Sequence, residues 1–191
     1  MVGAFLFTYD RLYYLSKMNS NYFNQESERL RYRALTREDI PVWATFFENN
    51  DRLHFFNLDS GCNGLEQAEI WIERQLGRYK DFGLGLLAVE EKSSDTLIGI
   101  VGLIPRSFEA SEEIEVGYSF MPHSWGNGYA TEAAITMKEF AKKNGIAPRV
   151  VSMIDPGNIA SINVAKRNGM HPLFDTVFEG QKHIVYGTEN F

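Results

Sequence analysis

The sequence has a single cysteine, Cys62, among its 191 residues. One thiol can form neither an intramolecular disulfide nor a multi-cysteine zinc site, and such usage is typical of a reducing, cytoplasmic compartment. The histidines lack the spacing of metal ligands, so we expect no metal. No run of about 18 uncharged apolar residues occurs, so we expect no membrane-spanning helix and no membrane partner.

Basic charge is also in short supply, with 19 Lys and Arg against 25 Asp and Glu and a net charge of −6. A nucleic-acid-binding surface needs a basic face, so we expect no nucleic-acid partner. The acidity favours a cationic or neutral partner instead. The hydrophobic fraction of 44% is sufficient for a packed core, and the length suits one domain.

The first 27 residues differ from the rest of the chain. Their apolar run, Val2–Phe7, is short, is not preceded by a basic residue, and is followed at once by Asp10 and Arg11, so it does not fit a secretory signal. We predict that residues 1–27 form a helical appendage that docks on the domain or on another copy of the chain. The second case would make a homodimer. The domain itself is expected over residues 28–191.

The body of the chain has a mixed order of strands and helices. Apolar alternation and helical spacing predict strands over 30–35, 86–92, 96–104, 114–120, 149–154, 173–178 and 182–188, and helices over 37–49, 65–80, 129–144 and 159–168. This α/β (α+β) order, with adjacent hairpins, predicts a mixed sheet flanked by helices.

The most informative stretch runs from Glu113 to Asn144 as strand, glycine-containing loop and helix. Asn127-Gly128 could instead form a type I′ hairpin turn, but the helical spacing that follows Gly128 argues against it. The first amides of a helix lack partners and lie at the positive end of its dipole, and glycines let the backbone approach an anion closely. The stretch therefore predicts a diphosphate site.

Two common diphosphate motifs do not fit this loop. A Walker loop requires Gly-Lys-Ser/Thr, whereas Gly128 is followed by Tyr129 and Ala130. A Rossmann fingerprint belongs in a parallel βαβ unit near the start of a domain, and this loop lies mid-chain after several strands. A kinase or a dehydrogenase is accordingly disfavoured.

The loop resembles the signature of the GNAT acyltransferase superfamily, Gln/Arg-x-x-Gly-x-Gly/Ala. Gly128 and Ala130 match its glycine and small positions, and Trp125 replaces the Gln/Arg. Residues 125–133 read Trp-Gly-x-Gly-Tyr-Ala-Thr-Glu-Ala, which is similar to the loop of the Rim-type ribosomal-protein N-acetyltransferases. A second block, Asn158-x-x-Ser161 and then 168–170, follows at the expected distance, so the resemblance covers about residues 28–188.

The resemblance implies a GNAT-like fold, a mostly antiparallel sheet whose fourth and fifth strands splay apart, with acetyl-CoA as co-substrate. The backbone amides around residues 126–130 would hold its pyrophosphate, and the pantetheine arm would lie as a pseudo-strand beside Tyr118–Met121. The cofactor-binding residues would be Tyr118, Phe120, Met121, Trp125, Gly126, Asn127, Gly128, Tyr129, Ala130, Thr131, Asn158 and Ser161.

The resemblance also suggests catalytic roles. Glu115 would act as the general base through a water, with Glu113 on the same strand face as a substitute; alternatively Glu115 only binds substrate or pairs with a cation. A backbone amide near Phe120 or Met121 would stabilise the oxyanion. The departing thiolate would be helped by a nearby donor, and no tyrosine occurs between residues 129 and 186 to supply it. This leaves Ser161, as proton donor, or Asn158, in contact with the cofactor, unless both merely cap the helix that follows.

Two functions are compatible with these features. The first is N-acetyltransfer from acetyl-CoA to a primary amine, by direct attack in a ternary complex. The acceptor would be a peptide N-terminus or a small amine, and the aromatic connection around residues 54–58 would shape its pocket. The second is a non-catalytic module that binds or senses acyl-CoA, for which the missing tyrosine leaves room.

Overall fold

The computed structural model describes residues 19–56, 58–108 and 111–191. Eight strands form one sheet in the order β1-β2-β3-β4-β5-β6-β8-β7. Their bounds are β1 Asn24–Glu26, β2 Leu30–Arg33, β3 Gly85–Glu91, β4 Thr96–Ser107, β5 Glu112–Phe120, β6 Val151–Ile154, β7 His171–Phe178 and β8 Gln181–Gly187. All neighbours are antiparallel except β5 and β6, which run parallel. The predicted mixed, mostly antiparallel sheet is confirmed.

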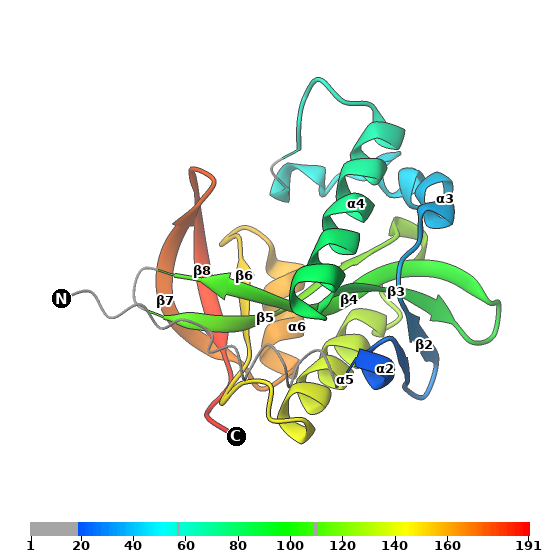
Figure 1. Cartoon of the computed structure of the whole chain (residues 1–191). Coiled ribbons are helices and arrows are strands. Elements are labelled where there is room, and N and C mark those ends of the chain that lie inside the picture. Colours follow the sequence, from blue (N-terminus) through cyan, green and yellow to red (C-terminus); the bar gives the residue numbers. More distant parts are fainter. Residues whose placement is uncertain (1–18, 57, 109–110) are drawn as a thin grey trace.

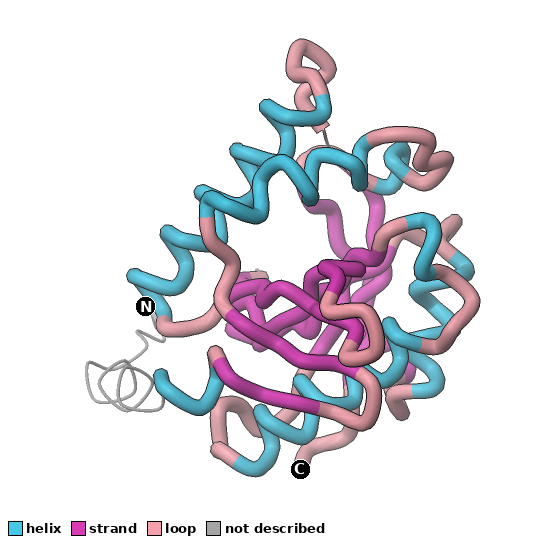
Figure 2. The backbone as a smooth tube through the Cα atoms, turned by 90° about the vertical axis from the view of Figure 1, so that its right-hand side faces the viewer, coloured by secondary structure: helices cyan, strands magenta, loops and turns pink. Residues whose placement is uncertain are grey.

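Helices cover both faces of this sheet (Figure 1). They are α2 Asn19–Tyr22, α3 Ile40–Ala44, α4 Gly64–Phe82, α5 Tyr129–Lys143 and α6 Ile159–Arg167. The buried residues divide into one cluster that includes α5 and α6 and another that includes α3 and α4. Figure 2 shows the strands enclosed between these helical segments. Each face therefore has its own hydrophobic core.

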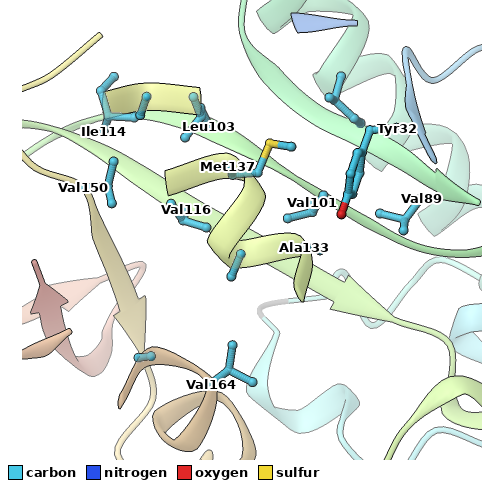
Figure 3. Packing of buried hydrophobic residues seen from close by; sticks show 14 of the residues in the cluster. Tyr32, Val89, Val101, Leu103, Ile114, Val116, Ala133, Met137, Val150 and Val164 are labelled. Carbon is cyan, nitrogen blue, oxygen red and sulfur yellow. The ribbon is translucent and has the colours of Figure 1, made fainter. Parts of the chain in front are cut away.

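The cluster that includes α5 and α6 is called the α5 core, and the one that includes α3 and α4 is called the α4 core. The α5 core depends on small residues at helical spacing. Ala133, Ala134, Met137 and Ala141 are buried on the face of α5 that meets the sheet. Figure 3 shows Ala133 and Met137 among strand residues such as Val116. Alanine side chains take up little space between helix and sheet, so α5 packs closely on β4 and β5.

The prediction of one regular helix over 37–49 is wrong. The structure has a 3₁₀ turn over Arg37–Asp39, the short helix α3, and a second 3₁₀ turn over Thr45–Phe47. Trp43 of α3 stacks on Phe46 of the second turn, with ring centroids 4.6 Å apart and planes 8° apart. Tight aromatic packing in the α4 core thus replaces regular helical geometry.

Residues 19–26, predicted as part of an appendage, are integrated into the domain. β1 pairs with β2, and Tyr22 is 1% exposed within the α5 core. The Tyr22 hydroxyl donates to the Gly85 carbonyl at 2.5 Å and accepts from the Leu103 amide at 2.8 Å. Residues 1–18 lie outside the described chain, so the appendage as a whole and its dimer role stay predictions.

We expect Tyr22→Phe to lower the free energy of unfolding by about 1–3 kcal/mol, because it leaves a buried amide and a buried carbonyl without their partner. Urea denaturation measures this change. Tyr129→Phe removes a hydroxyl that contacts Glu91 at the surface and should cost no more than about 0.5 kcal/mol. Equal losses in the two variants would show that the buried hydroxyl has no special role.

Candidate active site

The candidate site lies where β5 and β6 diverge. These strands share one bridge, Glu115 with Val151, and the Ser152 hydroxyl donates to the Val116 carbonyl at 2.8 Å. Beyond this point the edge of β5 is no longer paired with β6. Backbone groups of alternate residues point to the same edge of a strand, so the amides of Tyr118 and Phe120 face the opening. The predicted splay of these two strands is confirmed.

Two cavities meet at this opening. The larger measures about 420 Å³, lies beside α4, and includes Glu115 in its wall. The smaller, about 100 Å³, lies beside the start of α5 and includes Trp125 and Ala130. The two share Phe56, Tyr118, Ser119, Asn158 and Ser161. Two ligands that enter the two cavities from opposite sides would meet between these five side chains.

The loop before α5 has the geometry of an anion site. Gly126 and Gly128 have φ values of 81° and 80°, and the loop leads directly into α5 instead of returning as a hairpin. The Gly128 carbonyl accepts from the Thr131 and Glu132 amides. Among the described residues, none accepts a hydrogen bond from the backbone amides of 126–130. These amides are therefore available to an anion such as a diphosphate.

Arg29 holds this loop in place, a role that sequence analysis missed. Its guanidinium donates to the Asn127 carbonyl at 2.9 Å and to Glu132 at 2.8 Å, and it lies 4.6 Å from the centre of the Tyr129 ring. Glu132 also accepts from the Ser27 hydroxyl and the Arg29 amide. Burial would raise the pKa of the Glu132 carboxyl, but these hydrogen bonds outweigh it and lower the pKa.

Trp125, which replaces the Gln/Arg of the family signature, joins the loop to the end of β5. Its indole N–H donates to the Phe120 carbonyl at 2.7 Å, and the Arg52 guanidinium lies 3.8 Å from the centre of its ring. Arg52 lines the smaller cavity and was not predicted from the sequence. An aromatic ring is thus used here for packing and for one hydrogen bond, where the signature has a polar chain.

The backbone amides of Phe120 and Met121 are not equally available to donate a hydrogen bond to an oxyanion. The Met121 amide already donates to the Ile98 carbonyl at 2.9 Å, and its side chain is 1% exposed. Met121 is therefore not available as the donor expected from the sequence, because the chain turns at this residue to enter the loop. The Phe120 amide remains a candidate, since it faces the opening.

Both candidate carboxylates are buried and paired with arginines. Glu115 contacts Arg106 and lines the larger cavity. Glu113 binds Arg149 through two contacts, at 2.6 and 3.2 Å, and is not part of the cavity wall. The pairing of Glu115 with a cation, expected as an alternative, is therefore present, and of the two acids only Glu115 lines the cavity.

Asn158 and Ser161 lie at the meeting point of the cavities and also begin α6. The Asn158 side chain caps α6 by accepting from the Ser161 amide at 3.1 Å, so the capping role expected as an alternative is present for Asn158. The Tyr118 hydroxyl donates to the Ser161 carbonyl at 3.1 Å. Burial raises the pKa of Tyr118 above its ordinary value, so its hydroxyl stays protonated.

The part of the chain that the structure describes has no group of three or more His, Cys, Asp or Glu side chains that could hold a metal ion. Within the same residues, no helix combines the length and the apolarity needed to cross a membrane.

Comparison with known proteins identifies related sequences and folds. Residues 29–171 match the family model for the acetyltransferase (GNAT) domain. The uncharacterized protein YkkB of Bacillus subtilis is 31% identical over 76% of this chain and 83% of its own. An acetyltransferase structure from Agrobacterium tumefaciens has a TM-score of 0.71 at 25% identity, with 87% of this chain and 94% of that chain covered.

A solved Rim-type structure has the same fold. RimL, a ribosomal L7/L12 α-N-protein acetyltransferase in complex with coenzyme A, has a TM-score of 0.72 at 14% identity. The superposition covers 86% of this chain and 96% of that chain. The predicted resemblance to this group is confirmed at the level of the fold.

We expect Glu132→Gln to lower the free energy of unfolding at pH 7 by about 1–3 kcal/mol, through weaker bonds to Arg29 and Ser27. Because the folded carboxyl has a lowered pKa, its contribution is present above the ordinary value of about 4.3 and is lost as the pH falls through the folded pKa. Urea denaturation across a pH series should therefore show the two proteins converging in acid. Glu139→Gln, at an exposed position of the same helix, is the control and should change little at any pH.

Proposed function

Because the chain belongs to the GNAT acetyltransferase family, we propose that it transfers the acetyl group of acetyl-CoA to a primary amine by direct attack in a ternary complex. Acetyl-CoA-dependent acyl transfer is the activity of the family. The observation that supports a ternary complex in this chain is the meeting of two cavities at the fork of β5 and β6. Thioester and amine could then react without a covalent enzyme intermediate.

On this proposal, the smaller cavity holds the thioester arm and the loop holds the pyrophosphate. The free amides of Gly126, Asn127, Gly128, Tyr129 and Ala130 suit two phosphates, and the positive end of α5 adds to the attraction. Thr131 follows in the first turn of the helix. The open edge at Tyr118 and Phe120 offers amides to the pantetheine chain and to the developing oxyanion.

The amine must lose a proton for the reaction, and its own pKa decides how much help it needs. An α-amine with a pKa near 8 is roughly one-tenth neutral at pH 7, whereas a lysine near 10.4 is neutral only at about 0.04%. We assign the proton acceptor to Glu115, acting through a water, because it is the predicted acid that lines the acceptor cavity. Arg106 keeps this carboxylate oriented.

Three polar side chains lie at the meeting point of the cavities, where they can assist the leaving thiolate. Ser161 and Asn158 are the groups predicted from the sequence, and both line the two cavities. The Ser161 hydroxyl can return a proton, whereas the Asn158 amide can only donate a hydrogen bond. The Tyr118 hydroxyl is a second candidate proton donor and stays protonated at neutral pH. It lies on β5, before the loop, so the absence of a tyrosine between residues 129 and 186 does not leave the site without one.

The pyrophosphate assignment predicts that Gly126→Asp binds coenzyme A about tenfold or more weakly than Gly126→Asn. Both side chains tolerate a positive φ, and a Cβ at this position meets no atom within 4 Å, so the two variants differ in charge alone. Titration calorimetry with coenzyme A measures the affinities. Similar affinities in the two variants would place the diphosphate elsewhere.

The base assignment predicts that Glu115→Gln lowers kcat/KM in a thiol-release assay by roughly 10² to 10⁴, with activity rising again at high pH as more amine becomes neutral. Glu113→Gln, outside the cavity wall, should keep the pH profile of the natural protein even if it lowers stability. A uniform loss at every pH in Glu115→Gln would limit Glu115 to binding. Coenzyme A binding without thiol release for any amine would favour the non-catalytic alternative.

A further inference from the structure

The wall that α4 contributes to the larger cavity is unexpectedly basic. Arg74 and Arg78 both line the cavity, and they lie one helical turn apart on the same face of α4. Neither forms an ion pair with any Asp or Glu of the described chain, whereas Glu73 of the same helix pairs with Arg37. Two guanidinium groups therefore face the cavity without an acidic partner.

Arg78 is held in position by a neutral side chain. The buried Gln75 accepts from the Leu86 amide at 3.0 Å and from the Arg78 guanidinium at 3.0 Å through the same oxygen. This bond uses one of the five donors of Arg78 and leaves its other N–H groups for a ligand. Gln75 thus ties the guanidinium to β3, and the position of Arg78 is fixed by the sheet.

The arrangement opposes stability in the absence of a ligand. Burial lowers the pKa of Arg78 to about 10, and the nearby positive charges of Arg106 and Arg74 contribute to this shift. The negative charge of Glu115 has a smaller, opposite effect. Like charges four residues apart also destabilise a helix. Unpaired charges that lower the stability of the protein and lie beside a cavity are typical of a functional site. An anionic group on the ligand would offset this loss of stability.

The remaining charges of the cavity come from other elements. Arg106 and Glu115 neutralise each other. Asp155 follows β6, and Glu179 lies in the turn between β7 and β8. These two acids therefore line the cavity on the side formed by β6, β7 and β8, whereas Arg74 and Arg78 line it on the side formed by α4. The cavity is therefore divided by charge, which suits a ligand with a cationic and an anionic end.

We propose that the acceptor is a primary amine that also carries an oxyanion, a carboxylate or a phosphate, bound by Arg74 and Arg78 while the amine points toward Glu115 and the fork of β5 and β6. The planar guanidinium of arginine binds such oxyanions through two parallel hydrogen bonds. This inference rests on the proposed acetyl transfer and narrows its acceptor from any primary amine to an anionic one.

Matched pairs of amines test the inference. The probes are free amino acids with their α-carboxamides, and phosphoethanolamine with ethanolamine, so that the pairs separate a carboxylate source from a phosphate source. We expect the anionic member of at least one pair to have a kcat/KM about tenfold or more above that of its neutral partner. Arg78→Gln and Arg74→Gln should each reduce that preference about tenfold, mainly through KM, and Arg78→Lys should retain part of it.

Two variants distinguish specific binding by the arginines from a general effect of charge and from a loss of folding. Lys80→Gln removes one positive charge from an exposed position of the same helix and should keep the preference. Arg74 is exposed, so its variant tests the idea even if Arg78→Gln fails to fold. Equal use of both members of every pair, or a preference unchanged in the Arg74 and Arg78 variants, would overturn the inference.

A binding measurement distinguishes this inference from the proposed reaction. The thermal shift of the coenzyme A complex on addition of each probe reports binding without turnover. An Arg74- and Arg78-dependent shift with the anionic probes, but no thiol release, would support the anionic site and refute acetyl transfer. Thiol release with neutral amines, and no selective shift with anionic ones, would support acetyl transfer and refute the anionic site.

Discussion

The parallel contact between β5 and β6 is the constraint on which the site depends. Antiparallel neighbours can be joined by a short turn, but parallel ones need a crossover, which here is α5. The chain must therefore leave the end of β5, begin a helix and return to β6. The free amides at the start of α5 and the open edge of β5 consequently lie next to each other, and both follow from a single connection.

Charge in this protein has to be considered locally. The chain carries a net charge of −6, which favoured a cationic or neutral partner. In the structure the two buried acids of β5, Glu113 and Glu115, are each neutralised by an arginine, and the free charges of the α4 wall are positive. Net charge is a sum over a mostly solvated surface, whereas a cavity of a few hundred cubic ångströms depends on a few side chains.

The sequence predicted what is encoded locally. Helical spacing, a glycine loop and the Asn158 cap located α5, α6 and the loop between residues 124 and 128 correctly. Contacts between distant residues could not be predicted, because nothing near Arg29 or Arg106 in the chain indicates which carboxylate each will meet. The same holds for the short strand β1 and for the 3₁₀ turns around Trp43, where tertiary packing overrides local preference.

The two halves of the site are built on different cores, and this has a consequence for specificity. The loop before α5 is fixed by α5 and by Arg29 on one face of the sheet, while Arg74 and Arg78 are carried by α4 on the other. Substitutions at distant, separate positions act almost independently on stability and geometry. The cavity-facing residues of α4 can therefore change without disturbing the fork of β5 and β6, and on the proposed function such changes would alter the class of acceptor but not the chemistry.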